Sequence, residues 1–98
     1  MRIFTKTTLR KFWEIYPDAK PSLEFWYETV ESTFFRNPND VIRHFKNSDT
    51  VGNNRIVFNI TQNKYRLIVK FEYDRQLAYV RFIGTHKDYD KINDIQNI

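Results

Sequence analysis

The chain has 98 residues, a length typical of one domain, so we expect residues 1–98 to form a single folding unit. Its formal net charge of +4 favours polyanionic partners only weakly, and the absence of cysteine excludes disulfides, thiolate metal sites and cysteine nucleophiles. No signal peptide and no stretch of the roughly 18 apolar residues needed to span a membrane is present, so we expect a cytoplasmic protein with no membrane contact.

The first third of the sequence predicts a short strand and then two amphipathic helices. Residues 1–4 fit a strand, and Thr7 or Thr8 can cap the first helix. Pro17 ends that helix, and Pro21, which is tolerated in a first turn, marks the start of the second. We expect an αα-hairpin whose apolar stripes are Leu9, Phe12, Trp13 and Tyr16, then Leu23, Tyr27, Val30 and Phe34.

The middle of the chain is polar and predicts connections. The Asn-Pro-Asn-Asp run at 37–40 breaks the hairpin, and Asp40 is a candidate cap for a short helix that extends to Phe45. Residues 47–54 include Gly52 and predict a loop.

From Arg55 the apolar pattern has a period of two, which predicts three strands. We place them at Arg55–Ile60, Lys64–Tyr73 and Leu77–Gly84. If Gln62-Asn63 and Asp74-Arg75 form the tips of two hairpins, the residue numbers of cross-strand partners sum to a constant. The predicted pairs are Phe58 with Leu67, Asn59 with Arg66, Arg55 with Lys70, Val69 with Val80, Leu67 with Phe82 and Ile68 with Arg81.

This register divides the sheet into two different faces. The apolar face is the expected docking surface for the helices: Ile56, Phe58, Ile60, Tyr65, Leu67, Val69, Phe71, Ala78, Val80 and Phe82. The opposite face collects four cations, which are Arg55, Arg66, Lys70 and Arg81, together with the amide of Asn59.

Four cations on an uncovered sheet face are a candidate platform for RNA. Like charges on neighbouring strands repel, as Arg55 and Lys70 would, unless an anion lies between them. The alternative interpretation is an ordinary solvated face, because antiparallel sheets often leave one face wet and such faces carry Lys and Arg.

His86 and Tyr89 follow the last predicted strand and lie three residues apart, a spacing that aligns side chains on one helical turn. RNA cleavage requires a base for the 2′-OH, cations for the charged phosphorane and an acid for the leaving oxygen. Imidazole suits proton transfer near neutral pH, and Arg suits bidentate phosphate contact. A lone His is more often a surface residue, and Tyr89 can equally pack on the core with its hydroxyl wet.

Other chemistries find no support in the sequence. The chain contains no GxGxxG, no GxxxxGK[ST] and no HExxH segment, and its two histidines are too far apart to predict a metal site. None of the serines lies at a nucleophile elbow. We expect neither a metal nor another cofactor.

Three stretches resemble the HigB toxin family of type II toxin–antitoxin systems. They are residues 51–60 (VGNNRIVFNI), 63–69 (NKYRLIV) and 79–92 (YVRFIGTHKDYDKI). The likeness extends to the helical half through Tyr16-Pro17-Asp18-Ala19 and Trp26-Tyr27, so it covers nearly the whole chain.

The resemblance implies an α+β, RelE-like fold in which a small antiparallel sheet packs one face on an N-terminal helical hairpin. It implies an mRNA interferase that cuts mRNA in the ribosomal A site and binds a HigA-like helix-turn-helix antitoxin, through which it associates indirectly with operator DNA. Arg66 looks like the strand arginine that contacts the scissile phosphate in RelE-like enzymes. Tyr89 looks like their C-terminal tyrosine, which stacks on a base or aids proton transfer, and His86 resembles the polar residue before it.

The sequence departs from the RelE pattern where those enzymes carry a lysine pair before the arginine strand. This chain has Lys64 and Arg55 there at a different spacing, which leaves the general base open. The favoured hypothesis is a metal-independent endoribonuclease; the alternatives are a non-catalytic RNA- or ribosome-binding module and a co-repressor partner of the antitoxin. We expect Arg66, Arg81, His86 and Tyr89 to be catalytic, and Arg55, Asn59, Lys64, Lys70 and Lys87 to bind RNA.

Overall fold

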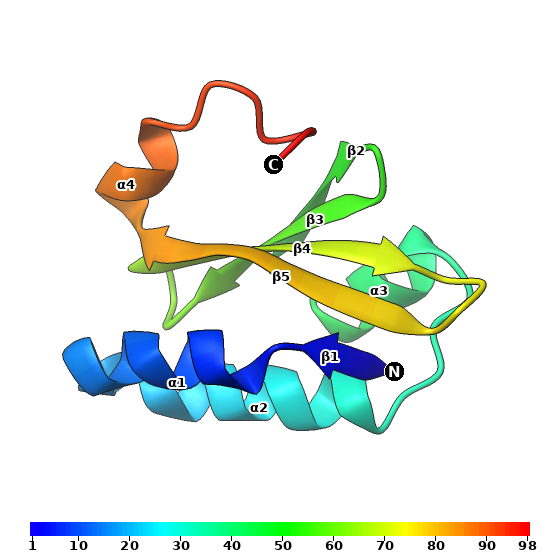
Figure 1. Ribbon diagram of the computed structural model, residues 1–98, viewed down its shortest axis with the longest axis horizontal. Helices are drawn as coiled ribbons and strands as arrows, with labels where there is room; N and C mark the ends of the chain where they lie inside the picture. The colour runs from blue at the N-terminus through cyan, green and yellow to red at the C-terminus, as the bar shows by residue number, and fades with distance from the viewer.

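The computed structural model describes all 98 residues as an α+β fold, which confirms the predicted class (Figure 1). The five-stranded sheet has the order β1-β5-β4-β3-β2, in which β1 pairs parallel with β5 and all other neighbours are antiparallel. The strands are β1 (Arg2–Phe4), β2 (Ser48–Gly52), β3 (Arg55–Ile60), β4 (Tyr65–Glu72) and β5 (Leu77–Thr85). The helices are α1 (Lys6–Ile15), α2 (Lys20–Glu31), α3 (Pro38–His44) and α4 (His86–Asp90), with a 3-10 turn at Pro17–Ala19.

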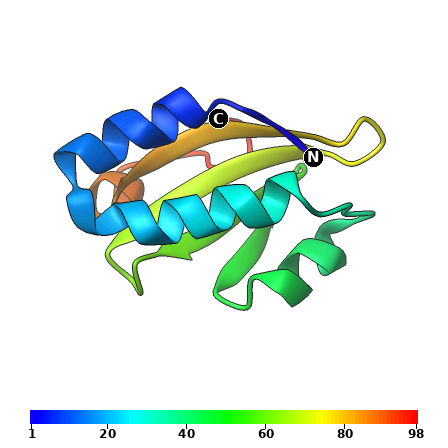
Figure 2. The ribbon, with the colours of Figure 1, turned by 90° about the horizontal axis from the view of Figure 1, so that it is seen from below.

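Helices α1, α2 and α3 cover one face of the sheet, as Figure 2 shows from the helical side. Leu9 and Trp13 of α1 and Leu23, Trp26 and Val30 of α2 are buried against the apolar strand residues. Burial of each such side chain stabilises the fold by about 1.5–3 kcal/mol. The predicted packing of the N-terminal helices on one face of the sheet is therefore confirmed, and the opposite sheet face is left without any of these three helices.

Three details of the helical half differ from the sequence prediction. The first helix begins at Lys6, before both threonines proposed as caps, and no side chain caps it. The second ends at Glu31, so the helical period does not extend to Phe34, which is 69% exposed, and Phe35 is buried instead. The third is capped by Asn37, whose Oδ1 accepts from the N–H of Asp40 at 3.0 Å. Asp40 is itself nearly buried and pairs with the arginines at positions 36 and 43.

The strands β1 and β2 extend the sheet beyond the three predicted strands. The expected short strand at the start of the chain is present and lies beside β5. The predicted loop at 47–54 is wrong, because residues 48–52 form the edge strand β2. Asn53 and Asn54 have φ values of 52° and 63°, which is the backbone of a tight hairpin whose twist matches its flanking strands.

The predicted register holds for β3–β4 and fails in part for β4–β5. Phe58 pairs with Leu67, as predicted, although the connection at Thr61–Lys64 has four residues. Val69 pairs with Val80, also as predicted, but a bulge follows in β5 and leaves Arg81 without a partner. A bulge inserts one residue and re-aims the side chains beyond it. Ile68 therefore pairs with Phe82, and Leu67 pairs with Ile83. Phe82 and Ile83 thus exchange the faces predicted for them.

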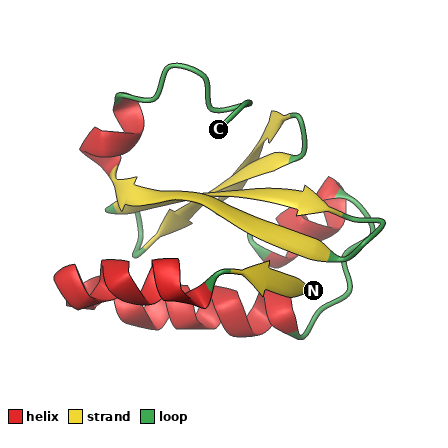
Figure 3. Ribbon diagram, viewed as in Figure 1, coloured by secondary structure: helices red, strands yellow, loops and turns green.

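The last eight residues form a tail that returns to the sheet. The tail, which we define as residues 91–98, leaves α4 and crosses above the sheet on the side opposite α1 and α2 (Figures 1 and 3). Its far end contacts the β2–β3 turn, where Asn53 Nδ2 donates to the main-chain oxygen of Gln96 at 2.9 Å. In the whole chain no helix has both the length and the apolarity required to cross a bilayer.

Candidate nuclease site

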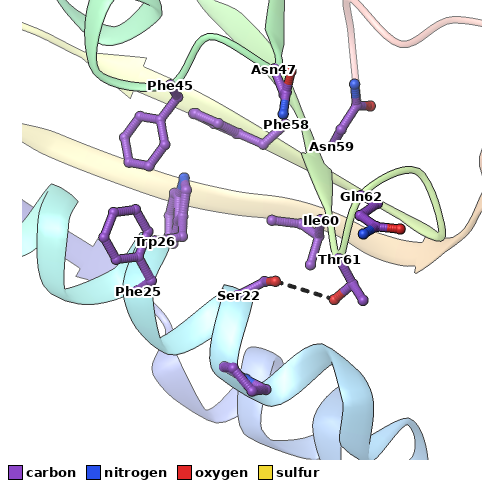
Figure 4. A pocket seen from close by; sticks show the side chains of 11 residues that line it. Ser22, Phe25, Trp26, Phe45, Asn47, Phe58, Asn59, Ile60, Thr61 and Gln62 are labelled. Atoms are coloured by element: carbon purple, nitrogen blue, oxygen red, sulfur yellow. Dashed lines mark hydrogen bonds between the residues drawn. The ribbon is translucent and has the colours of Figure 1, made fainter.

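Arg66 lies at the centre of the candidate site, on the sheet face opposite helices α1 and α2. In the sheet it pairs with Asn59 of β3 on one side and with Gly84 of β5 on the other. The amide of Asn59 points away from the side chains of Phe58 and Ile60 (Figure 4). Alternation along β3 and β4 therefore brings the guanidinium and this amide together, as the sequence predicted.

The guanidinium of Arg66 stacks on the ring of Tyr89, with its Cζ 5.7 Å from the ring centroid. Its Nη1 donates to the main-chain oxygens of Asn63 and Tyr65 at 3.1 and 3.2 Å. Its Nε and Nη2 have no hydrogen-bond partner in the chain. The stack and the two hydrogen bonds fix the plane of the guanidinium, so an anion can take up the two remaining donors.

His86 begins α4 with its imidazole about half exposed, next to Tyr89. The two ring centroids are 6.4 Å apart and nearly perpendicular, at 83°. His86 Nδ1 lies 3.1 Å from Oδ2 of Asp90, one helical turn further on. A carboxylate at Nδ1 orients the ring and favours a proton on that nitrogen, so Nε2 is the atom free to exchange a proton with a ligand. Thr85 holds the turn, since its Oγ1 accepts from the N–H of Asp88 at 3.1 Å.

Phe82 is a component of the site that the sequence reasoning placed on the wrong face. The bulge turns it to the side of Ile68, and its ring lies 6.5 Å from that of Tyr89. A Cβ built on Gly84 would lie 2.5 Å from Phe82 Cζ, so only glycine leaves room for the ring in this position. The signal was present in the sequence as a glycine two residues after an aromatic residue in a strand. The sequence reasoning also missed Asp90, although its i+4 spacing from His86 predicts the contact between them.

The side-chain amine of Lys64 binds the helical half of the chain, although the main-chain oxygen of Lys64 accepts from the N–H of His86 at 3.2 Å. Its Nζ donates to Asp18 Oδ2 at 2.8 Å, and Tyr65 Oη donates to Oδ1 of the same carboxylate at 2.5 Å. The hydrogen bond from Lys64, followed by that from Tyr65, lowers the pKa of Asp18 below its usual value. The Asp18 carboxylate in turn raises the pKa of Tyr65 to about 12. Lys64 therefore joins the β3–β4 connection to the turn between α1 and α2.

The other predicted cations have different surroundings. Arg81 is exposed at the bulge and Lys87 is exposed on α4, and neither side chain makes a hydrogen bond or an ion pair within the chain. Lys70 is half-buried, four residues beyond Arg66 on β4. Arg55 is only 7% exposed and donates from Nη2 to the main-chain oxygen of Ile98 at 2.6 Å. Arg66, His86 and Tyr89 thus lie together with Asn59 beside Arg66, whereas the guanidinium of Arg55 and the amine of Lys64 are bound to other parts of the chain.

A pocket of about 430 Å³ opens on the helical side, between α2 and β3 (Figure 4). Ser22 and Thr61 are linked across it by a hydrogen bond of 3.3 Å between their hydroxyls. No charged or titratable side chain lines it, so it offers neither a phosphate ligand nor an acid–base pair. The lining residues are Pro21, Ser22, Phe25, Trp26, Phe45, Asn47, Phe58, Asn59, Ile60, Thr61 and Gln62.

The group of Arg66, His86 and Tyr89 on the open sheet face, which we call the open-face site, has the elements that phosphodiester chemistry requires. It joins a fixed arginine with free donors, an imidazole with a free nitrogen and an aromatic ring suited to stack on a base. Nowhere in the chain do three or more His, Cys, Asp or Glu side chains gather as a candidate metal site.

Comparison with known proteins agrees with the family resemblance of the sequence. Residues 19–92 match the family model of the HigB toxin, described as the RelE-like toxic component of a toxin–antitoxin system. The mRNA interferase toxin HigB of Escherichia coli K12 is 28% identical over 92 residues, which cover 92% of this chain and 88% of that protein. The mRNA interferase HigB of Shigella flexneri gives the same values, and that of Escherichia coli O6:H1 is 26% identical over 94 residues, covering 94% and 91%. The matched residues include the open-face site, and the chain therefore belongs to the HigB toxin family of RelE-like toxin components.

Proposed function

We propose that this chain is an endoribonuclease that cleaves mRNA by attack of a 2′-OH on the adjacent phosphate. The observation that carries the proposal is the stack of Arg66 on Tyr89 beside an imidazole whose Nδ1 is held by Asp90. This combination supports the proposal because a guanidinium, an aromatic ring and an imidazole lie at one rim of the open sheet face. The names of the relatives, which are mRNA interferases, support the same substrate.

The roles follow from the free atoms at the site. Nε and Nη2 of Arg66 bind the non-bridging oxygens of the scissile phosphate and stabilise the charge that grows on them. Nε2 of His86 exchanges protons, either taking the 2′-OH proton or giving one to the 5′ oxygen as that bond breaks. Tyr89 stacks on a base or relays a proton, and Arg81 supplies a second cation from the bulge. The reaction leaves a 2′,3′-cyclic phosphate and a free 5′-OH and requires no metal ion.

We also propose the surroundings in which this activity operates. The toxin family implies an antitoxin, which we expect to be a HigA-like helix-turn-helix protein that links the pair indirectly to DNA. The substrate is mRNA on the translating ribosome in the cytoplasm. Asn59, Lys70 and Lys87 add contacts to the RNA backbone, because they lie on the open face or beside it without ion-pair partners.

The decisive experiment is cleavage by the His86→Ala variant. Loss of a proton-transfer group lowers the cleavage rate by about 10²–10⁴-fold. Primer extension on mRNA from cells that express each variant should show discrete new 5′ ends for the wild type and almost none for His86→Ala. Each purified variant is also assayed on mRNA with and without ribosomes.

The matched control is His44→Ala, which removes the other histidine. His44 lies on α3, where its Nδ1 is 3.0 Å from the main-chain oxygen of Asp40, and we expect cleavage to be unchanged. If the wild type arrests growth without producing new 5′ ends, the chain is a binding module rather than a nuclease. If His86→Ala cleaves as well as the wild type, the imidazole has no part in the reaction.

A further inference from the structure

A small apolar area on the open face of the sheet is buried on the side where the tail, residues 91–98, crosses. Val57 and Ile68 pair with each other there and are 5% and 0% exposed, although α1, α2 and α3 lie on the opposite side. Both are separate from the core beneath the helices. The tail has an inward side that matches this area: Ile92, Ile95 and Ile98 are half-buried, whereas Asn93, Asp94, Gln96 and Asn97 are exposed.

The far end of the tail is bound by two side chains from the start of β3 and the turn before it. Asn53 Nδ2 donates to the main-chain oxygen of Gln96 at 2.9 Å and to Asn97 Oδ1 at 3.1 Å. Arg55 donates from Nη2 and Nε to the main-chain oxygen of Ile98 at 2.6 and 3.2 Å. Its Nη1 donates to the main-chain oxygen of Asn53 at 2.9 Å, which joins the two anchors.

The burial of Arg55 distinguishes it from an RNA ligand. An arginine that binds phosphate has free and accessible donors before the ligand arrives, as Arg66 has in Nε and Nη2. Arg55 is 7% exposed, and all three of its guanidinium nitrogens donate within the chain. Its geometry is that of a structural clamp.

The near end of the tail joins α4, which carries two members of the candidate site. This helix spans only His86–Asp90, and a helix of five residues is not stable without external contacts. It meets the sheet through the N–H of His86, which donates to the main-chain oxygen of Lys64, and through the ring of Tyr89, which lies near Arg66 and Phe82. Five residues separate Asp90 from the anchored Gln96, so fixing one restricts the other.

We propose that Arg55 and Asn53 are positioning residues that clamp the tail and thereby hold Tyr89 over Arg66 and His86 beside Tyr89. Neither touches the RNA. A small displacement of a group far from the reacting atoms can cost about 10²-fold in rate, because catalysis depends on near-attack geometry. The expected effect on cleavage rests on the proposed nuclease function, whereas the expected effect on the position of α4 does not.

The test compares Arg55→Met, which keeps the apolar stem and removes the donors, with Arg75→Met. Arg75 is an exposed arginine at the β4–β5 turn that pairs with Glu72 and makes no hydrogen bond to the tail. The second test variant is Asn53→Gly, which removes the anchoring amide and keeps a residue that tolerates the φ of 52°. If Arg55→Met does not fold, Asn53→Gly still tests whether the clamp positions α4.

We expect Arg55→Met and Asn53→Gly to lower the single-turnover cleavage rate at saturating enzyme by at least tenfold and to leave the Kd for uncleavable 2′-deoxy-substituted RNA within twofold. Hydrogen exchange of the α4 amides should become faster in both variants and stay unchanged in Arg75→Met. Removing residues 94–98 should have the same effect, and adding Arg55→Met to that truncation should change nothing further.

Three results would overturn the proposal. A weaker Kd with an unchanged cleavage rate makes Arg55 an RNA ligand. Faster cleavage after truncation makes the tail a cover over the site. Unchanged exchange in α4 shows that the clamp does not hold the helix. If the wild type cleaves no RNA, the nuclease proposal fails on its own, while the exchange measurement still decides whether the clamp positions α4.

Discussion

Phe82 is the side chain that most affects the surface around Tyr89. A regular strand would direct it into the core, where its apolar ring has an obvious place. The bulge at Arg81 instead puts the ring on the open face, above Gly84 and 6.5 Å from the ring of Tyr89. An aromatic ring there supports the tyrosine from one side, while Arg66 stacks on it at 5.7 Å.

Gly84→Ala tests this arrangement at the residue scale. The added Cβ would lie 2.5 Å from Phe82 Cζ, so the ring must move away from its place beside Tyr89. We expect a loss of stability of about 1–3 kcal/mol, typical of overpacking, and a clear drop in mRNA cleavage. Urea denaturation and a cleavage assay measure the two effects.

The control for this substitution is the same change in a Phe82→Leu background. Leucine has no ring over position 84, so the added methyl group should cost much less stability there. Equal costs in both backgrounds would show that the clash with Phe82 is not what requires glycine.

At the scale of elements, the β2–β3 hairpin illustrates how turn chemistry determines a strand. The residues of β2 are mostly polar, and no hydrophobic alternation marks them as a strand. The two asparagines at 53 and 54 adopt the left-handed conformation that a two-residue hairpin requires, and asparagine tolerates it better than other non-glycine residues. The turn therefore aligns β2 with β3 and places Asn53 beside the tail.

Asn54 provides the test at this scale, because it forms the turn without contacting the tail through its side chain. Its φ of 63° makes Asn54→Ala unfavourable by roughly 1 kcal/mol, the cost of a left-handed alanine. Asn54→Gly should be as stable as the wild type or slightly more stable. Midpoints of urea unfolding compare the variants, and equal midpoints for alanine and glycine would contradict the assigned turn.

At the scale of the whole molecule, one carboxylate connects the helical layer to the sheet. Asp18 follows α1 in the turn before α2, yet it binds Lys64 and Tyr65 at the start of β4. These hydrogen bonds lower its pKa below 3.8, so the folded state favours the ionised form more than the unfolded state does. The resulting stability is present above the unfolded pKa and is lost as the pH falls through the folded pKa.

Asp18→Asn should therefore be less stable than the wild type at pH 7, and the difference should shrink as the pH is lowered below 3.8. Thermal unfolding measured from pH 7 to pH 2.5 gives this comparison. Asp49→Asn is the control, because Asp49 is an exposed carboxylate in β2 that makes no side-chain hydrogen bond. A difference between Asp18→Asn and the wild type that persists undiminished at low pH would rule out the ionised carboxylate as its source.

The sequence by itself determined the features that depend on local pattern. The apolar stripe of Leu9 and Trp13 defined the helical face, and the period of two from Arg55 defined three strands. Symmetric pairing about a central tip was enough to place Asn59 beside Arg66, and the spacing of His86 and Tyr89 was enough to predict a shared turn. These are relations between residues a few positions apart, or between strands joined by one short connection.

Only the tertiary structure decided the relations between distant segments. The bulge at Arg81 moved Phe82 to the open face, the tail buried Arg55, and Asp18 bound Lys64 away from the site. Each of these depends on contacts between residues far apart in the chain. The free energy of such contacts is set by packing and not by local periodicity. For this reason two of the cations that the sequence assigned to RNA bind elsewhere in the chain, Arg55 at the tail and Lys64 at Asp18, while Arg66 remains at the candidate site.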